Sequence, residues 1–209
     1  MFVLGLLACA ASAQESCVGS SAALDPVQCA AWTELFDGSG GNGQWAACNG
    51  TQYRLDPCSC RVPAQPAVVG CNGRDITEIT LHKIGVFGTI PAALGSLTQL
   101  TFLNLPDNEI SGTVPASFAA LTKLAIFSVG GNRLSGAIPE GLAQLTLLRG
   151  LDVQCNHFSG RFPLGIAGLN TTCTLGGPAN GACVDGRGRN GWSCPLPQGA
   201  DQKCHASCQ

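Results

Sequence analysis

Hydrophobic positions repeat every 24 residues between Ile76 and Thr172 of this chain. Six apolar columns run unbroken through four copies, and they start at Ile79, Leu81, Val86, Ile90, Leu94 and Leu97. The first two columns alternate with other residues as in a half-buried strand. The later ones fall at three-residue spacing, which is typical of a short helical or 3-10 turn. The pattern therefore predicts four copies of one strand-and-turn unit.

One such unit cannot bury its own apolar side chains, whereas stacked units share a continuous core. Each stacked Leu or Ile stabilises the array by about 1.5–3 kcal/mol when it is buried. The strands then lie side by side at about 4.8 Å and form a narrow parallel sheet on the concave face of a curved array. We therefore expect an α/β solenoid with caps that cover the two ends of its core.

Three asparagines, Asn108, Asn132 and Asn156, occupy one column where the chain leaves the predicted strand. A buried asparagine amide at this point can bond to backbone groups that the turn leaves unpaired, and each copy repeats the arrangement one step along. We therefore expect a structural ladder of these three amides. The first copy holds Ile84 in the column, so the ladder starts at the second copy.

A glycine and a proline punctuate every copy. The glycines suit positions with φ > 0 or tight packing, and the prolines suit the start of a helical turn, where a missing N–H costs nothing. The residues are Gly88, Gly112, Gly136 and Gly160, and Pro91, Pro115, Pro139 and Pro163.

The copies "LTFLNLPDNEISGTVPASFAAL" and "LAIFSVGGNRLSGAIPEGLAQL" resemble the plant-type leucine-rich repeat LxxLxLxxNxLxGxIPxxLxxL. That repeat occurs in receptor-kinase ectodomains and in polygalacturonase-inhibiting proteins. The stretch "LDPVQCAAWTELFDGSGG" is similar to the helical N-terminal cap of those proteins. The resemblance implies a right-handed array, a further short strand at "SGxIP" and a role in extracellular binding.

We expect four regions along the chain. Residues 1–13 contain an apolar run followed by a small-x-small cleavage site, which predicts a secretory signal peptide; a buried apolar segment is the alternative. Residues 14–75 form a cysteine-rich N-terminal cap, residues 76–172 the four repeats, and residues 173–209 a cysteine-rich C-terminal cap. The protein is thus expected to be secreted, either to the extracellular space or to the cell wall.

Twelve cysteines remain after the predicted signal peptide is removed. Two even clusters in an exported chain indicate disulfides, although six cysteines allow about 15 connectivities, so the pairs stay open. The clusters are Cys17, Cys29, Cys48, Cys58, Cys60 and Cys71, and Cys155, Cys173, Cys183, Cys194, Cys204 and Cys208. For Cys155, a free thiol is the alternative to a bond with the C-terminal cap. Sequons at Asn49 and Asn170 suggest glycosylation.

The composition argues against several classes of function. Charged residues make up only 11% of the chain and the net charge is −2, so a nucleic-acid surface is not expected. No serine or cysteine forms a recognisable catalytic motif with a histidine, and the cysteine clusters fit disulfides better than metal ligands. Asp107 and Asp152 are better explained as surface charges than as a pair of catalytic acids. We expect no enzyme activity, no metal and no cofactor.

The outward positions of the predicted strands are free to contact a partner. Their mixed chemistry suits a protein or peptide better than a phosphate chain. The expected ligand-binding residues are Glu78, Thr80, His82, Phe102, Asn104, Asp107, Ile126, Ser128, Asp152 and Gln154, with Lys83, Pro106, Gly130, Gly131 and Gly150 on the same strip.

The leading hypothesis is therefore a secreted, non-enzymatic binding module that recognises an extracellular protein, peptide or wall component. A second hypothesis is an inhibitor of a polysaccharide-degrading hydrolase, which the resemblance to polygalacturonase inhibitors suggests. A third is a structural wall or matrix protein, and a fourth is a soluble fragment of a receptor ectodomain.

Overall fold

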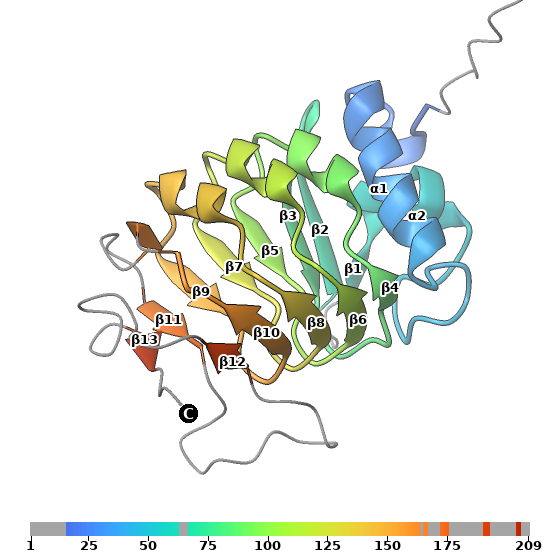
Figure 1. The fold of residues 1–209 in the computed structure, drawn as a ribbon. Coiled ribbons are helices and arrows are strands. Elements are labelled where there is room, and N and C mark those ends of the chain that lie inside the picture. Colours follow the sequence, from blue (N-terminus) through green and yellow to red (C-terminus); the bar gives the residue numbers. More distant parts are fainter. Residues whose placement is uncertain are drawn as a thin grey trace, which may run out of the picture.

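Stacked coils of chain form a solenoid with two sheets in the computed structural model of this protein (Figure 1). The structure describes residues 16–62, 67–163, 165–166, 172–175, 190–192 and 204–205. The predicted signal peptide, the sequon at Asn170, and Cys183, Cys194 and Cys208 lie outside the described residues. In Figure 1 the helical cap stands at one end of the stack, beside the first coil.

Helices build the N-terminal cap before the first coil. They are η1 (Gly19–Ser21), α1 (Pro26–Gly38), α2 (Gln52–Leu55) and η2 (Pro57–Ser59). Helix α1 begins after Asp25, whose side chain accepts a hydrogen bond from the Val27 backbone N–H at 2.9 Å, and Pro26 takes the first helical position. Both features are typical of a helix start, because they satisfy or remove an N–H that the helix cannot pair.

The cap buries three aromatic side chains, Trp32, Phe36 and Trp45, which cluster with ring centroids 5.2–6.1 Å apart. The indole N–H of Trp32 donates to the Tyr53 carbonyl, and that of Trp45 donates to the Ser39 carbonyl. Each indole therefore has its polar group satisfied, and this cluster forms one continuous core with the first coil.

Three disulfides hold the cap together and resolve the pairing that the sequence leaves open. Cys17 bonds to Cys29, Cys48 to Cys60, and Cys58 to Cys71. The six N-terminal cysteines thus pair among themselves, as an even cluster predicts. Cys155 is also disulfide-bonded, so it is not a free thiol.

The inner sheet contains eight strands in the order β1-β2-β3-β5-β7-β9-β11-β13. The strands from β3 onward pair in parallel, as expected, but β1 and β2 add an antiparallel hairpin that the periodicity does not predict. The bounds are β1 (Arg61–Val62), β2 (Ala67–Asn72), β3 (Asp75–Leu81), β5 (Phe102–Asn104), β7 (Ile126–Ser128), β9 (Gly150–Asp152), β11 (Thr172–Thr174) and β13 (Cys204–His205).

A second sheet of five parallel strands and a row of 3-10 helices complete the coils. The strands are β4 (Phe87–Thr89), β6 (Glu109–Gly112), β8 (Arg133–Gly136), β10 (His157–Gly160) and β12 (Gly191–Trp192). The 3-10 helices are η3 (Ala92–Ser96), η4 (Ala116–Ala120) and η5 (Glu140–Gln144), and each follows a repeat proline. Strands β4, β6, β8 and β10 end at the repeat glycine or one residue after it, so they overlap only the start of the "SGxIP" segment.

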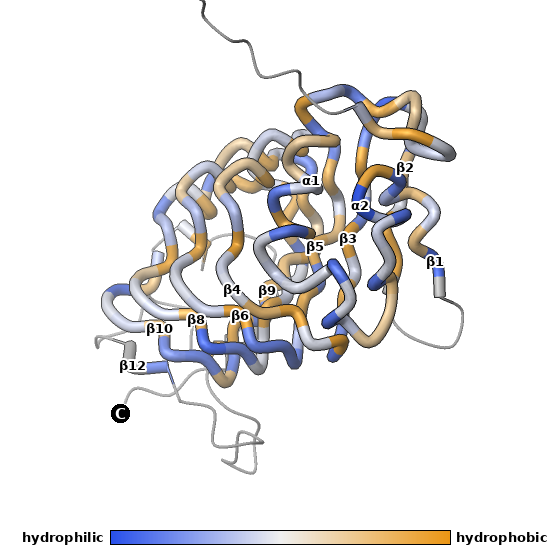
Figure 2. Tube along the Cα trace, turned by 90° about the vertical axis from the view of Figure 1, so that its right-hand side faces the viewer, coloured by the Kyte–Doolittle hydropathy of each residue, from blue (hydrophilic) through white to orange (hydrophobic). Residues whose placement is uncertain are grey.

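The apolar columns point into the solenoid. Every described side chain of the six columns is at most 4% exposed. Figure 2 shows that successive coils repeat the same succession of hydrophobic and hydrophilic stretches along the trace. The repeat glycines Gly88, Gly112, Gly136 and Gly160 all have φ between +75° and +85°, which explains their recurrence.

Side-chain amides tie neighbouring coils together. Asn132 accepts from the Ile110 backbone N–H at 3.0 Å and donates to the carbonyls of Leu105 and Val129 at 2.9 Å each. Asn108 and Asn156 make the equivalent bonds one coil earlier and one coil later. Each amide therefore satisfies backbone groups of its own coil and of the preceding one.

Two further strands, β11 and β13, extend the inner sheet beyond the four regular copies. Strand β11 pairs with β9, and Asn190 takes the place of a ladder residue. Its amide oxygen accepts from the Phe158 N–H at 2.9 Å, and its amide nitrogen donates to the Val153 carbonyl at 2.8 Å. Asn190 thus adds one more amide to the ladder after Asn156.

Candidate functional site

The outward positions of the inner sheet line up in two rows, because the parallel strands pair in strict register. The first row contains Glu78, Phe102, Ile126 and Gly150, and the second contains Thr80, Asn104, Ser128 and Asp152. All eight are at least partly exposed. The residues between the two rows are buried, and they are Ile79, Leu103, Phe127 and Leu151. We call these eight residues the concave rows.

The centre of the first row is apolar. Phe102 is 43% exposed, which makes it one of the few large hydrophobic side chains on the surface of the described residues. Ile126 lies on the next strand and is half-buried. Its terminal methyl would stand 2.7 Å from a Cβ added to Gly150, so the glycine leaves room for the isoleucine to lie flat. Together, Phe102 and Ile126 form an apolar platform.

Carboxylates border this platform. On one side, Glu78 pairs with Phe102 across the strands and accepts a hydrogen bond from the Thr80 hydroxyl at 3.0 Å. On the other side, Asp152 accepts from the Gln154 backbone N–H at 3.2 Å and from the Ser128 hydroxyl at 3.4 Å. Burial raises the pKa of Asp152 above its ordinary value, and the nearby charge of Asp107 adds to this effect.

A third pair of side chains joins the first and second coils. His82 Nε2 and Asp107 Oδ2 lie 3.2 Å apart, and both side chains are about two-fifths exposed.

Two positions that were expected to be exposed on the concave strip, Gly130 and Gly131, are buried. A Cβ on Gly130 would stand 2.6 Å from an oxygen of Asp152, so the carboxylate covers this glycine.

A left-handed backbone conformation recurs every 24 residues, and the sequence pattern does not reveal it. It occurs at Lys83, Asp107, Gly131 and Cys155. All four have positive φ, between +50° and +66°. Only Gly131 is a glycine, and the other three positions hold three different residue types. A search for a recurring residue type therefore does not find this conformation. The backbone N–H groups of the first three donate to carbonyls of the following coil at 2.9–3.1 Å, and these bonds fix the left-handed corner.

The remaining predicted residues lie apart from the concave rows. Asn49 is exposed, and its amide nitrogen donates to the Trp45 carbonyl at 2.8 Å.

The described residues contain no group of three or more His, Cys, Asp or Glu side chains arranged to hold a metal ion. None of the helices described here has the length and apolarity needed to cross a membrane.

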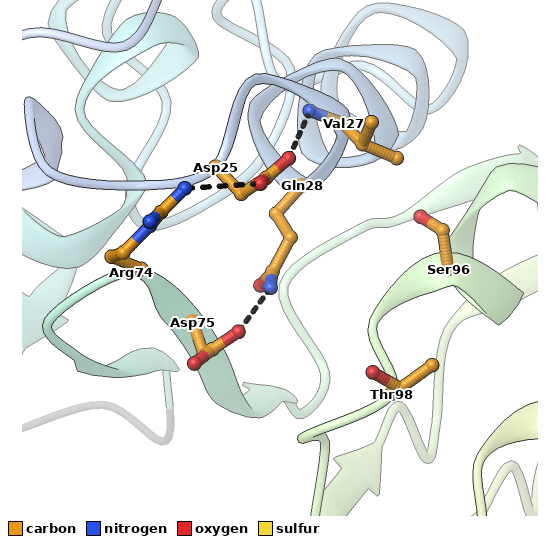
Figure 3. Close-up of a pocket in the computed structure, with 7 residues that line it drawn as sticks. All are labelled: Asp25, Val27, Gln28, Arg74, Asp75, Ser96 and Thr98. Carbon is orange, nitrogen blue, oxygen red and sulfur yellow. Dashed lines mark hydrogen bonds and ion pairs between the residues drawn. The ribbon is translucent and has the colours of Figure 1, made fainter.

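A polar pocket of about 390 Å³ lies where α1 meets the first coil (Figure 3). Its charged groups face one another: Arg74 pairs with Asp25 at 3.5 Å, and the Gln28 amide donates to Asp75. Gln28 also accepts from the Ile76 backbone N–H. Because these groups satisfy one another across the junction, they attach the cap to the solenoid and leave the concave rows as the candidate binding surface.

Comparison with known proteins supports the architecture. A family model described as Leucine Rich Repeat matches residues 99–121. No curated protein sequence matches the chain.

Three similar solved structures come from Arabidopsis thaliana. The leucine-rich-repeat ectodomain of the receptor kinase SOBIR1 has 20% sequence identity and a TM-score of 0.63, covering 86% of this chain and 88% of that one. The BIR3–SERK2 complex has 21% identity and a TM-score of 0.59, with 85% and 88% covered. The BIR2 ectodomain has 22% identity and a TM-score of 0.57, with 83% and 84% covered. The chain therefore has the leucine-rich-repeat fold of plant receptor-kinase ectodomains.

Proposed function

We propose that this protein is a secreted, non-enzymatic binding module whose concave rows recognise an extracellular protein or peptide. The observation that carries the proposal is the exposed platform of Phe102 and Ile126 at the centre of the inner sheet. Large apolar side chains surrounded by polar ones are typical of the centre of a protein interface. The solenoid holds them on regular, paired strands, so little order has to be gained on binding.

Two further observations support this proposal. The disulfides of the cap require an oxidising compartment, which agrees with an extracellular location. A solenoid of similar fold occurs in the BIR3–SERK2 complex, an assembly of two proteins. Recognition of another polypeptide is therefore a use that the fold permits.

The test is crosslinking capture of extracellular proteins and peptides by the full-length chain and by two variants. Phe102→Ser combined with Ile126→Ser should reduce capture of specific partners at least about tenfold, since central aromatic and aliphatic anchors commonly contribute more than about 1 kcal/mol each. Leu147→Ser is the matched control, because Leu147 is 50% exposed and lies outside the concave rows. Equal capture by wild type and the double variant would place binding elsewhere on the molecule.

A further inference from the structure

The apolar platform cannot be covered without covering carboxylates as well. Glu78 lies one strand from Phe102, and Asp152 lies one strand from Ser128 in the second row. Taking an ionised carboxylate out of water is costly unless a cation accompanies it. A partner that seats on Phe102 and Ile126 therefore has to compensate these charges.

Asp152 has hydrogen-bond donors that hold its carboxylate in place but leave its charge unbalanced. The Ser128 hydroxyl and the Gln154 backbone N–H are both neutral. Among the described residues, no ion pair joins Asp152 or Glu78 to a basic side chain. Gly130 leaves the space that the Asp152 carboxylate occupies, because a Cβ there would stand 2.6 Å from the oxygen. The Asp152 carboxylate is thus preorganised, and no basic side chain of the described residues pairs with it.

In the part of the chain that the structure describes, the basic residues of the coils lie outside the concave rows, and His205 in β13 lies in register with Asp152 two strands further along the sheet. His82 pairs with Asp107, Lys83 is exposed in the turn after β3, and Arg149 is exposed just before β9. The rows themselves contain two carboxylates and no cation. Complementarity therefore favours a positively charged partner group over a neutral or acidic one.

The spacing of the groups matches an extended chain. Ile126 and Asp152 are separated by one strand step and two residues along the strand, which corresponds to about 8 Å between their Cα atoms. Alternate residues of an extended peptide point to the same side about 7 Å apart. One apolar side chain on Ile126 and one basic side chain on Asp152 can therefore come from positions i and i+2.

We infer that the partner presents a polypeptide segment with a large apolar residue and, two positions away, an arginine or lysine that pairs with Asp152. This inference rests on the proposed function and adds the chemistry of the partner to it. Glu78 takes a second basic group at the opposite side of the platform when the segment supplies one.

The experiment is selection of a displayed random heptapeptide library on the full-length protein, using wild type, Asp152→Asn, and the Phe102→Ser, Ile126→Ser double variant. Wild type should enrich peptides with an apolar-x-basic pattern, and Asp152→Asn should enrich apolar peptides without the basic preference. The double variant should enrich neither. Glu140→Gln is the matched charge control, because Glu140 is exposed on η5 outside the rows.

A synthetic copy of an enriched peptide provides the second measurement. Replacing its basic residue with glutamine should weaken binding to wild type about tenfold and leave binding to Asp152→Asn nearly unchanged. Enriched peptides without a basic residue on wild type would overturn this inference and leave the proposed function standing. Failure of wild type to enrich any peptide beyond the double variant would instead count against the concave rows as a polypeptide-binding surface.

Discussion

At the scale of single residues, the buried asparagines and the Asp152 carboxylate have opposite effects on the stability of the solenoid. Asn132 is fully buried, and its amide bonds go to backbone groups of its own coil and of the coil before it. Asp152 lies on the surface of the sheet and carries a charge that the fold partly desolvates. The first residue stabilises the solenoid, whereas the second lowers its stability and leaves a charge available to a partner.

Replacing Asn132 with leucine should lower the free energy of unfolding by about 2–3 kcal/mol. The reason is that the Ile110 N–H and the carbonyls of Leu105 and Val129 lose their partner inside the core, and each buried unsatisfied group costs about 1–3 kcal/mol. Chemical denaturation measures the change. Asn104→Leu, in the half-exposed second row, is the control and should change stability by less than about 0.5 kcal/mol.

Asp152→Asn should raise the free energy of unfolding at pH 7. The folded state raises the pKa of this carboxyl through burial, so the ionised form is less favourable folded than unfolded. That penalty is present above the folded pKa, fades as the pH falls through it, and is absent once the unfolded carboxyl is also protonated. Thermal unfolding should therefore show a more stable variant at pH 7 and no difference near pH 3. A variant that is less stable at pH 7 would contradict this assignment.

At the scale of elements, small residues let the 3-10 helices pack closely along the outside of the coils. A Cβ on Gly141 in η5 would stand 2.6 Å from Ala119 Cβ in η4, and Gly165 meets Ala143 in the same way. Gly95 meets Ser117 one coil earlier. The spacing between coils on this side is therefore set by residues that lack bulk.

Gly141→Ala should destabilise the protein by about 1–3 kcal/mol, although alanine is the better helix former, because the added methyl overlaps a neighbouring coil. The matched control is Gly38→Ala at the end of α1, where no atom lies within 4 Å of the added Cβ. The control should be neutral or slightly stabilising. Equal melting temperatures for the two variants would show that the coils have room to separate.

Strands and turns were predictable from sequence where the same residue type recurs. The column led by Ile79 and the glycines mark their structural role once per copy, and the asparagines do so from the second copy onward. The β1–β2 hairpin was not predictable in this way, because it occurs once and its pairing depends on the cap. The left-handed corner at Lys83 and Asp107 was equally hidden, since the backbone conformation recurs there while the side chain changes.

The concave rows were predictable because successive side chains of a strand point to opposite faces of the sheet, so the residues on either side of a buried one face outward. The sequence could not show that Asp152 lies over Gly130, because that contact joins two coils through side-chain packing. It also could not identify Asn190 as a ladder residue. Fourteen residues separate Asn190 from Leu175, whereas two separate Asn156 from Val153, so the 24-residue period is lost at this point.

At the scale of the whole molecule, the cap protects the exposed end of the first coil. Phe87 in β4 donates its backbone N–H to the Ser39 carbonyl, and a Cβ on Gly88 would stand 2.4 Å from the Gly38 carbonyl oxygen. The loop of residues 38–43 at the end of α1 therefore packs against the solenoid. It covers the edge of the second sheet, where unpaired backbone groups would otherwise face solvent.

Removing one cap disulfide should weaken the first coil before the later ones. Cys48→Ser combined with Cys60→Ser should cost about 2–4 kcal/mol, the usual contribution of a bond that closes a loop of this length. Because coils contact only their neighbours, hydrogen exchange should accelerate most in residues 84–96 and least in residues 140–152. Uniform acceleration along the chain would show instead that the whole solenoid unfolds as one unit.

The amide ladder also gives the stack a direction. Each asparagine completes the coil before it: Asn132 receives the N–H of Ile110, Asn156 that of Leu134, and Asn190 that of Phe158. During synthesis, each new coil therefore lacks an acceptor for one backbone N–H until the next coil has been made. Shortening the chain from its carboxyl end likewise leaves this N–H of the last coil without its asparagine acceptor. Asn190 supplies the missing acceptor for the fourth turn, so the polypeptide has to extend past an insertion before its final regular turn is finished.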